Sequence, residues 1–239
     1  IVRLERDIEK ERRLEQTRKD FISGVSHELK TPLSVLESCL YVLKDKADSP
    51  RRDHYFAAME DELKRMNLLV GDMLELAKYE SGSYKMEMEP FRIDEALERI
   101  CARLSPDMED KGIRLDTRIF PAEVIANRHR IEQVIVNFLT NAIRYTPERH
   151  DISVSTMEEG DSVTVNIENR GVRIPSEQME KIWDRFYRGE PSRHRSTGGT
   201  GLGLAISKQI LELHGAPYGA ENTEDGVLFY FRLKKALNV

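Results

Sequence analysis

The chain has few cysteines and no long apolar run. Cys39 and Cys101 are its only cysteines, they lie far apart, and neither belongs to a CxxC pair. This argues against a disulfide framework or a zinc site, and it makes a reducing compartment the expected one. No apolar stretch approaches the roughly 20 residues needed to span a bilayer, and no signal peptide is present. Because the chain begins with Ile1 and not Met, we expect it to be an excised piece of a longer protein.

The chain also lacks an excess of basic residues. It carries 37 Lys and Arg against 42 Asp and Glu, a formal net charge of −5, which argues against nucleic-acid binding. Charged residues make up 33% of the sequence and hydrophobic residues 39%, as expected for a soluble, folded protein. Its 239 residues are enough for two modest domains.

The first 20 residues are rich in charges of both signs, with apolar residues only at wide intervals. Two interpretations are open. The stretch is either a helix that pairs in a coiled coil through a thin apolar seam, or a frayed helical tail.

Two apolar stripes follow, each with the alternating 3,4 spacing of one helix face. Ser49 and Pro50 have the residue types of an N-cap and first helical position, so they predict the start of the second helix. The two stripes predict an antiparallel helical hairpin. Further apolar residues make both stripes too broad for two helices to cover, so we expect a homodimer that forms a four-helix bundle. The stripes are Ile22, Val25, Leu29, Pro32, Leu36, Cys39 and Leu43, then Phe56, Met59, Leu63, Met66, Val70, Met73 and Ala77, with extra apolar residues at Leu33, Leu40, Leu69, Leu74 and Leu76.

The pattern changes after the break at residues 81–83. Short β-like runs alternate with amphipathic helical ones, which predicts an α/β domain with helices on one face of a mixed sheet. The predicted strands are 113–119, 152–156, 163–167 and 227–233, and the predicted helices are 93–104, 130–144, 176–183 and 202–214.

His27 falls opposite the first apolar stripe, so we expect an exposed imidazole. Pro32, inside the helical pattern, predicts a local bend. These residues alone also fit an ordinary surface histidine. The string FISGVSHELKTP, however, resembles the H-box of sensor histidine kinases, and SHELKTP matches it throughout. The resemblance implies that His27 is the phosphoacceptor, that Glu28 is its activating base, and that Thr31 serves dephosphorylation of a partner.

A polar helix face carries the second motif. Asn137 and Asn141 lie four residues apart, so both face one side of the predicted helix 130–144, and amide oxygens suit a magnesium ion. The pattern NxxxNAxxYTP resembles the N-box of the same kinases. That resemblance implies that Asn141 ligates Mg²⁺, and that Asn137, Arg144 and Tyr145 line the nucleotide.

Glycines at 199, 201 and 203 precede an amphipathic helix, an arrangement that favours a phosphate-binding loop over a flexible linker. The string STGGTGLGLAI resembles the G2 box of the family, which implies that Gly199, Gly201, Gly203 and Leu204 bind ATP. Residues 167–175 and 182–189 resemble its G1 and F boxes. They imply that Asn169 and Gly171 bind the nucleotide, and that Trp183, Phe186 and Tyr187 pack at the hinge of the ATP lid. Arg185 or Arg188 could reach the γ-phosphate, and the resemblance favours Arg188.

The G1 segment departs from the family pattern DxGxG at two positions. Asn169 stands where an aspartate would accept a hydrogen bond from the adenine amino group, and Arg173 replaces the second glycine. Asparagine still offers an acceptor oxygen, but without charge. Arginine does not readily adopt a positive φ.

The resemblance covers about residues 15–235. It implies a sensor histidine kinase of a two-component system, with a signalling helix or coiled coil at 1–20, a dimerisation and phosphotransfer domain at 21–82, and a Bergerat-type two-layer α/β ATP-binding domain at 88–239. ATP and Mg²⁺ are the implied cofactors. A homodimer and a response-regulator receiver domain are the implied partners, without nucleic acid. The chain would be the cytoplasmic part of a bacterial protein anchored in the membrane upstream of residue 1.

Two other functions compete with this one. A dimeric docking scaffold with a degenerate ATP site is favoured by the changes in the G1 segment. A different ATPase of the same fold would need a glutamate at position 137 to activate water, and Asn137 cannot act as a base.

Overall fold

The computed structural model describes residues 2–45, 51–80, 86–189 and 199–236. Its contacts divide the chain into two compact units. The first contains Ile1–Leu74 with Gly198–Leu202, and the second contains Glu75–Thr197 with Gly203–Val239. Within the described ranges, no helix is both long enough and apolar enough to cross a membrane.

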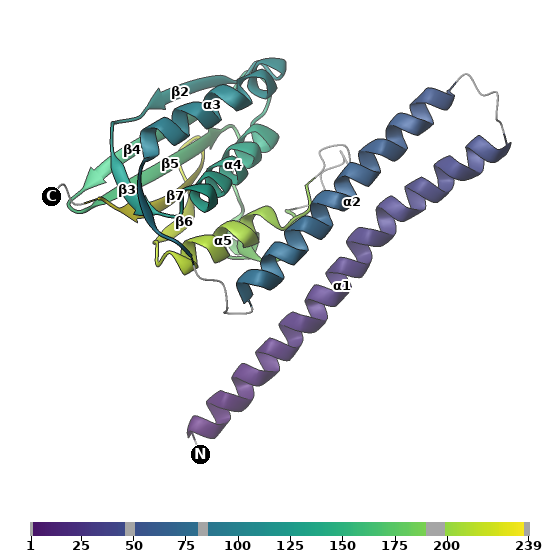
Figure 1. The fold of residues 1–239 in the computed structure, drawn as a ribbon, viewed down its shortest axis with the longest axis horizontal. Helices are drawn as coiled ribbons and strands as arrows, with labels where there is room; N and C mark the ends of the chain where they lie inside the picture. The colour runs from purple at the N-terminus through teal and green to yellow at the C-terminus, as the bar shows by residue number, and fades with distance from the viewer. Residues whose placement is uncertain (1, 46–50, 81–85, 190–198, 237–239) are drawn as a thin grey trace. The chain divides into compact units, whose positions relative to one another are not determined.

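The first unit is built on a helical hairpin, as the sequence predicts (Figure 1). Helix α1 spans Val2–Asp45 and helix α2 begins at Arg52 and continues to Glu80. Pro32 lies inside α1, which continues through it as one helix. The predicted helix start at Ser49 and Pro50 lies outside the described residues.

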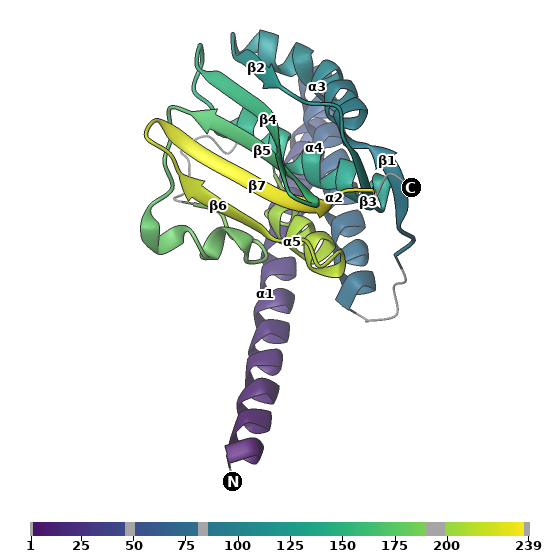
Figure 2. The same ribbon diagram turned by 90° about the vertical axis from the view of Figure 1, so that its left-hand side faces the viewer.

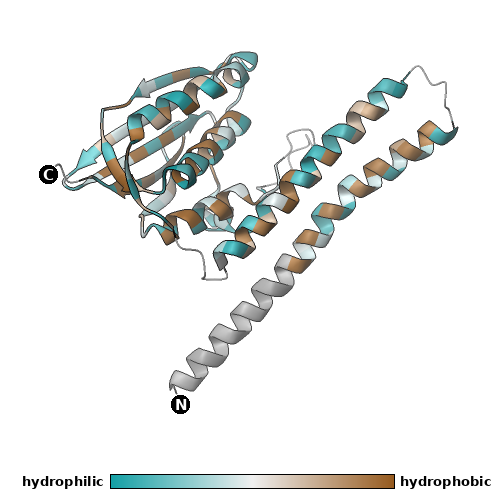
Figure 3. Cartoon of the chain, viewed as in Figure 1, coloured by the Kyte–Doolittle hydropathy of each residue, from teal (hydrophilic) through white to brown (hydrophobic). Residues whose placement is uncertain are grey.

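The buried face of α2 differs in part from the predicted one. Phe56, Leu63 and Val70 are exposed by 43%, 49% and 44%, whereas Leu69 is buried. Met59, Met66 and Met73 of the predicted stripe are half-buried, and Leu69 and Leu76, which widen that stripe in the sequence, are buried. The buried face of α2 in a single chain is therefore one part of a broader apolar surface. Hydrophobic residues recur along both helices (Figure 3), and many of them are exposed. Further exposed ones are Ile22, Leu33, Leu40, Tyr41, Leu68 and Leu74.

The second unit is a sheet with three helices on one face (Figures 1 and 2). The five strands lie in the order β2-β4-β5-β7-β6, with β2 parallel to β4 and the other pairs antiparallel. The prediction of helices on one face of a mixed sheet is confirmed. The strands are β2 (Arg114–Arg118), β4 (Asp151–Glu159), β5 (Ser162–Arg170), β6 (Tyr218–Asn222) and β7 (Gly226–Lys234), and the helices are α3 (Ile93–Asp110), α4 (Arg128–Tyr145) and α5 (Gly203–Leu213).

Several short elements were not predicted. Strands β1 (Glu89–Arg92) and β3 (Glu123–Ala126) form a separate two-stranded sheet, and β6 was also missed. The predicted helix 176–183 is instead two short 3₁₀ turns, η1 (Ser176–Gln178) and η2 (Lys181–Trp183). Four-residue strands and single turns are too short to leave a clear periodicity in the sequence.

Helix α4 supplies much of the core. Its apolar face is buried, and Phe138 packs against Phe229 and Phe231 of β7, with ring centroids 5.3 and 6.1 Å apart. Burying each such large side chain contributes roughly 1.5–3 kcal/mol to the free energy of folding. The remaining buried residues of this face are Ile131, Val134, Ile135, Leu139, Ala142 and Ile143.

The start of α4 is fixed by two polar side chains. Asn127 is the N-cap residue, and its Oδ1 accepts a hydrogen bond from the Arg130 N–H at 3.1 Å. The Asn127 N–H in turn donates to Nε2 of His214 at 3.0 Å, and Nδ1 of His214 lies 2.7 Å from the Ile210 carbonyl oxygen. An imidazole that accepts at Nε2 and donates at Nδ1 is neutral. Burial lowers the pKa of His214, in keeping with this neutral form.

The His214 contact predicts an acid-sensitive fold. Because folding lowers the pKa of His214, its stabilising contribution is complete above the unfolded-state pKa of about 6.5 and is lost as the pH falls towards the folded-state pKa. We expect the free energy of unfolding to drop by on the order of 1 kcal/mol more in the unaltered chain than in His214→Gln between about pH 7.5 and pH 5.5. Denaturant unfolding at both pH values measures this. His129→Gln, an exposed histidine on α4, is the control and should decline like the unaltered chain. An equal decline in His214→Gln would contradict the assignment.

Candidate functional site

His27 lies on α1 with its side chain 82% exposed, which confirms the predicted exposure. Its Nδ1 is 4.0 Å from Oε1 of Glu28, whose side chain is only 17% exposed. Thr31 lies one helical turn further on, also exposed, and its hydroxyl donates to the His27 carbonyl oxygen at 3.4 Å. A solvent-exposed imidazole beside a half-buried carboxylate is a suitable arrangement for a nucleophile with a neighbouring base.

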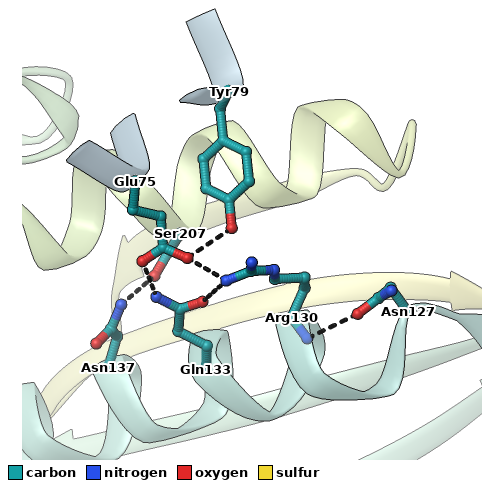
Figure 4. A network of polar contacts seen from close by, with 7 residues as sticks. All are labelled: Glu75, Tyr79, Asn127, Arg130, Gln133, Asn137 and Ser207. Atoms are coloured by element: carbon teal, nitrogen blue, oxygen red, sulfur yellow. Dashed lines mark hydrogen bonds and ion pairs between the residues drawn. The ribbon is translucent and has the colours of Figure 1, made fainter. Parts of the chain in front are cut away.

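Helix α4 presents Asn137 and Asn141 on its polar face. Nδ2 of Asn137 donates to the Gly203 carbonyl oxygen at 3.0 Å and to Oγ of Ser207 at 3.1 Å (Figure 4). Asn137 therefore ties α4 to the first turn of α5, and its Oδ1 is the atom left to face a ligand. Ser207 was missed in the sequence. The sequence signal that could have identified Ser207 is its position as a polar residue within the apolar pattern of α5, one turn after Gly203.

The first two turns of α4 carry a charged network (Figure 4). The Glu75 carboxylate accepts hydrogen bonds from the Arg130 guanidinium and, at 2.6 Å, from Nε2 of Gln133. The Tyr79 hydroxyl donates to Glu75 Oε1 at 2.7 Å, and the Arg130 guanidinium lies 5.4 Å from the centroid of the Tyr79 ring. All of these residues belong to the second unit. The polar face of α4 is thus occupied in its first turns by contacts with the end of α2.

The carboxyl end of α4 is capped by two side chains. The Thr146 hydroxyl donates to the Ala142 carbonyl oxygen at 2.6 Å. Nζ of Lys111 donates to the carbonyl oxygens of Ile143 and Arg144 at 2.8 and 3.1 Å. A cation at this end complements the helix dipole. These contacts fix the last turn of α4, where Arg144 is half buried and Tyr145 is exposed by 49%.

Asn169 lies near the end of β5 and is only 4% exposed. In the part of the chain that the structure describes, its side chain has no hydrogen-bond partner. The carboxamide is thus a nearly buried polar group at this end of β5, and it offers an acceptor oxygen and an NH₂ donor.

Gly171 follows with a φ of +92°, which an L side chain rarely adopts. A Cβ there would lie 2.7 Å from Cδ2 of His150 and 2.9 Å from Cδ of Pro147. Gly171 therefore lets the loop after β5 approach the segment that follows α4. Arg173 is absent from the residues with positive φ, so this loop accommodates it without backbone strain.

The glycine-rich segment divides between the units. Gly199 and Gly201 cluster with the first unit, and Gly201 has a φ of +71°. Gly203 and Leu204 open α5 in the second unit. The N-terminal N–H groups of a helix attract phosphate.

The segment that resembles the F box packs on the core. The Trp183 ring contacts those of Phe138 and Tyr218, with centroids 6.1 and 5.0 Å apart. Arg185 is half buried, and desolvation lowers its pKa, whereas Arg188 is exposed. Arg188 is therefore the more accessible of the two guanidinium groups.

Comparison with known proteins agrees with this arrangement. Residues 17–82 match a family model described as the His Kinase A (phospho-acceptor) domain. Residues 126–237 match the model of the histidine kinase-, DNA gyrase B- and HSP90-like ATPases. The solved catalytic domain of histidine kinase ThkA is 31% identical, and the match covers 63% of this chain and 97% of that one, with a TM-score of 0.57. The chain belongs to the histidine kinase family.

Longer relatives match over most of the chain. The sensor histidine kinase WalK of Bacillus subtilis (strain 168) is 34% identical over 228 residues, which is 91% of this chain and 36% of WalK. ThkA solved in complex with the response regulator protein TrrA is 26% identical, with a TM-score of 0.75, covering 91% of this chain and 61% of that one. The chain thus spans about a third of the length of WalK.

Gly171 provides a test of the site's backbone. Gly171→Ala should lower the free energy of unfolding by about 1 kcal/mol for the positive φ and by a further 1–3 kcal/mol or so for the contacts with His150 and Pro147. Gly160→Ala is the matched control, because Gly160 has a φ of +60° but open space around its Cβ position. Urea unfolding of both variants measures the difference. Equal losses would show that the close approach at Gly171 contributes nothing.

Proposed function

We propose that this chain transfers the γ-phosphate of ATP to His27 and then to an aspartate of a response-regulator receiver domain. The observation that carries the proposal is the exposed His27 with Glu28 at its Nδ1, within SHELKTP, in a chain that also belongs to the histidine kinase family through its ATPase unit. Phosphoryl transfer needs chiefly positioning and charge neutralisation. The complex of ThkA with TrrA supports a response regulator as the second partner.

The second unit supplies the nucleotide-binding groups. Asn169 offers a buried acceptor for the adenine amino group, and Gly171 keeps the adjoining loop close. Asn141, on the polar face of α4, would hold Mg²⁺, which neutralises phosphate charge when bound. Asn137 fixes the start of α5, where Gly203 and Leu204 present N–H groups to the phosphates.

The other predicted site residues would contact the two ends of the nucleotide or serve dephosphorylation of the regulator. Arg144 and Tyr145 would line the nucleotide at the end of α4, and Arg188 would reach the γ-phosphate. Gly199 and Gly201 would let the backbone approach the phosphates. Thr31, one turn beyond His27, would position water for dephosphorylation of the regulator, a second activity of the same helix.

A second copy of the chain would cover the apolar surface that the hairpin leaves exposed. Phe56, Leu63 and Val70 lie along α2, and Leu33 and Leu40 along α1. Exposed apolar patches of this kind mark association surfaces, and pairing two hairpins forms a four-helix bundle.

His27→Gln tests the function directly. The variant should bind ATP as the unaltered chain does, because His27 belongs to the first unit, and should transfer no phosphate to a receiver domain. Calorimetry measures ATP binding. The label that appears on the receiver domain after incubation with γ-labelled ATP measures the transfer. His54→Gln, an exposed histidine on α2, is the control and should transfer normally. Transfer by His27→Gln would refute the proposal.

The ATP affinity of Asn169 variants distinguishes a kinase from a docking scaffold. A hydrogen bond to a charged acceptor contributes roughly 1.5–3 kcal/mol and one to a neutral acceptor about 0.5–1.5 kcal/mol. We therefore expect the chain to bind ATP with Mg²⁺, and Asn169→Asp to bind ATP several-fold more tightly. Asn169→Ala should weaken ATP binding by a larger factor than the one that separates Asn169→Asp from the unaltered chain. Calorimetry on the three proteins checks this order.

Two results would contradict this account of Asn169. The scaffold function would prevail if the unaltered chain showed no binding at millimolar ATP and Asn169→Asp restored it. Unchanged affinity in Asn169→Ala would mean that Asn169 does not contact adenine.

A further inference from the structure

A half-buried cluster of charges lies in the hairpin, next to His27. Glu28 on α1 and Glu62 and Arg65 on α2 have side chains exposed by only 17%, 20% and 26%. All three belong to the first unit. Their neighbours along α2 on the same side, Met66 and Leu69, are half buried and buried. The charges therefore interrupt an otherwise apolar contact surface.

The groups form an ordered series. Nδ1 of His27 lies 4.0 Å from Oε1 of Glu28, and the other oxygen of Glu28 lies 3.8 Å from Nη2 of Arg65. Nη1 of Arg65 lies 4.0 Å from Oε1 of Glu62. The Arg65 guanidinium thus lies between the carboxylates of Glu28 and Glu62. The two oxygens of Glu28 face His27 and Arg65. These separations exceed hydrogen-bond length, so Arg65 interacts with the two carboxylates as opposite charges and not through hydrogen bonds.

Stability alone does not account for this cluster. Replacing half-buried ion pairs by apolar residues of similar size is often neutral or stabilising, so charges in a helix contact surface need another reason. Oε2 of Glu62 is also buried with no hydrogen-bond partner among the described residues, a further cost. The exposed pair Lys64 and Asp61, on the outer side of the same helix turn, has neither feature.

We propose that Arg65 is a positioning residue for Glu28. Resting on the proposed autokinase function, the inference is that Arg65, which lies between Glu62 and Glu28, holds the Glu28 carboxylate in place beside Nδ1 of His27. Arginine suits this position because its planar guanidinium presents donors at two ends, whereas a lysine ammonium is a single point charge. Without Arg65, two like-charged carboxylates would share the contact surface.

This placement determines which nitrogen reacts. Nδ1 lies on the Glu28 side of the ring, so in the proposed reaction Nδ1 carries the ring proton and Nε2 is the attacking atom. The Nε2 lone pair forms the bond to the γ-phosphorus as the bond from that phosphorus to the β,γ-bridging oxygen breaks. ADP leaves with that electron pair, and the Nδ1 proton passes to Glu28, so that the phosphorylated ring is neutral.

Single-turnover autophosphorylation of the full chain tests the role of Arg65. The variants are Arg65→Met, which keeps most of the apolar stem, Arg65→Lys, Glu28→Gln and the double variant Glu28→Gln with Arg65→Met. Lys64→Met is the matched control, since its side chain is 71% exposed on the neighbouring position. The rate is measured over a range of ATP concentrations, and helix content is followed by circular dichroism.

Arg65→Met should lower the maximal rate at least about tenfold, as part of the roughly 10²–10⁴-fold that a general base contributes, and leave KM for ATP within about twofold. The double variant should be no slower than Glu28→Gln alone, Arg65→Lys should fall between Arg65→Met and the unaltered chain, and Lys64→Met should be normal. If Arg65→Met does not fold, Arg65→Lys decides: a lower maximal rate at unchanged KM supports the proposal.

Three results would overturn the inference: a normal rate in Arg65→Met or in a folded Arg65→Lys, losses that add in the double variant, or a changed KM for ATP. Its failure is distinct from that of the proposed function. An unaltered chain that takes up no label refutes the kinase itself, whereas labelling of His27 with an unimpaired Arg65→Met refutes only the role of Arg65.

Discussion

The second unit depends on α4 being held on both of its faces. Its apolar face is buried against the sheet, where Phe138 meets the aromatic residues of β7. Its polar face is tied to α5 through Asn137, and its two ends are capped through Asn127 and Thr146. Because one helix carries both core residues and the predicted ligands of the nucleotide, the packing of the core sets the position of the site.

In the first unit, the constraint is the placement of His27 and Glu28 in the hairpin. The hairpin must present an exposed nucleophile, His27, beside a carboxylate that is partly withdrawn from water, Glu28. A carboxylate such as Glu28 in the contact between α1 and α2 requires a countercharge, and Arg65 lies close enough to provide it. These charges take the place of apolar packing in that layer of the contact. The hairpin also leaves a long apolar surface exposed, which a second copy would bury. In the proposed function, the exposed apolar surface would serve dimerisation and the His27 side of α1 would serve catalysis.

Long periodic elements could be predicted from the sequence, and contacts between distant segments could not. The exposure of His27 followed from its place opposite an apolar stripe, and the polar and apolar faces of α4 followed from the spacing of its asparagines. The sequence indicated a broad apolar surface on α2, but not that Leu69 would be buried and Phe56 exposed in a single chain, because such residues lie on two adjacent faces of the helix. The contact of Lys111 with the end of α4 spans more than 30 residues and leaves no local signal.

The central claim is that phosphate from ATP becomes bonded to a nitrogen of His27. The most direct measurement is to incubate the chain with γ-labelled ATP and Mg²⁺, test the label in acid and in base, and map it by tryptic digestion. The account predicts an acid-labile, base-stable label on the peptide of residues 20–30, which contains His27. A label that survives acid, or one carried by a peptide of the second unit, would contradict it.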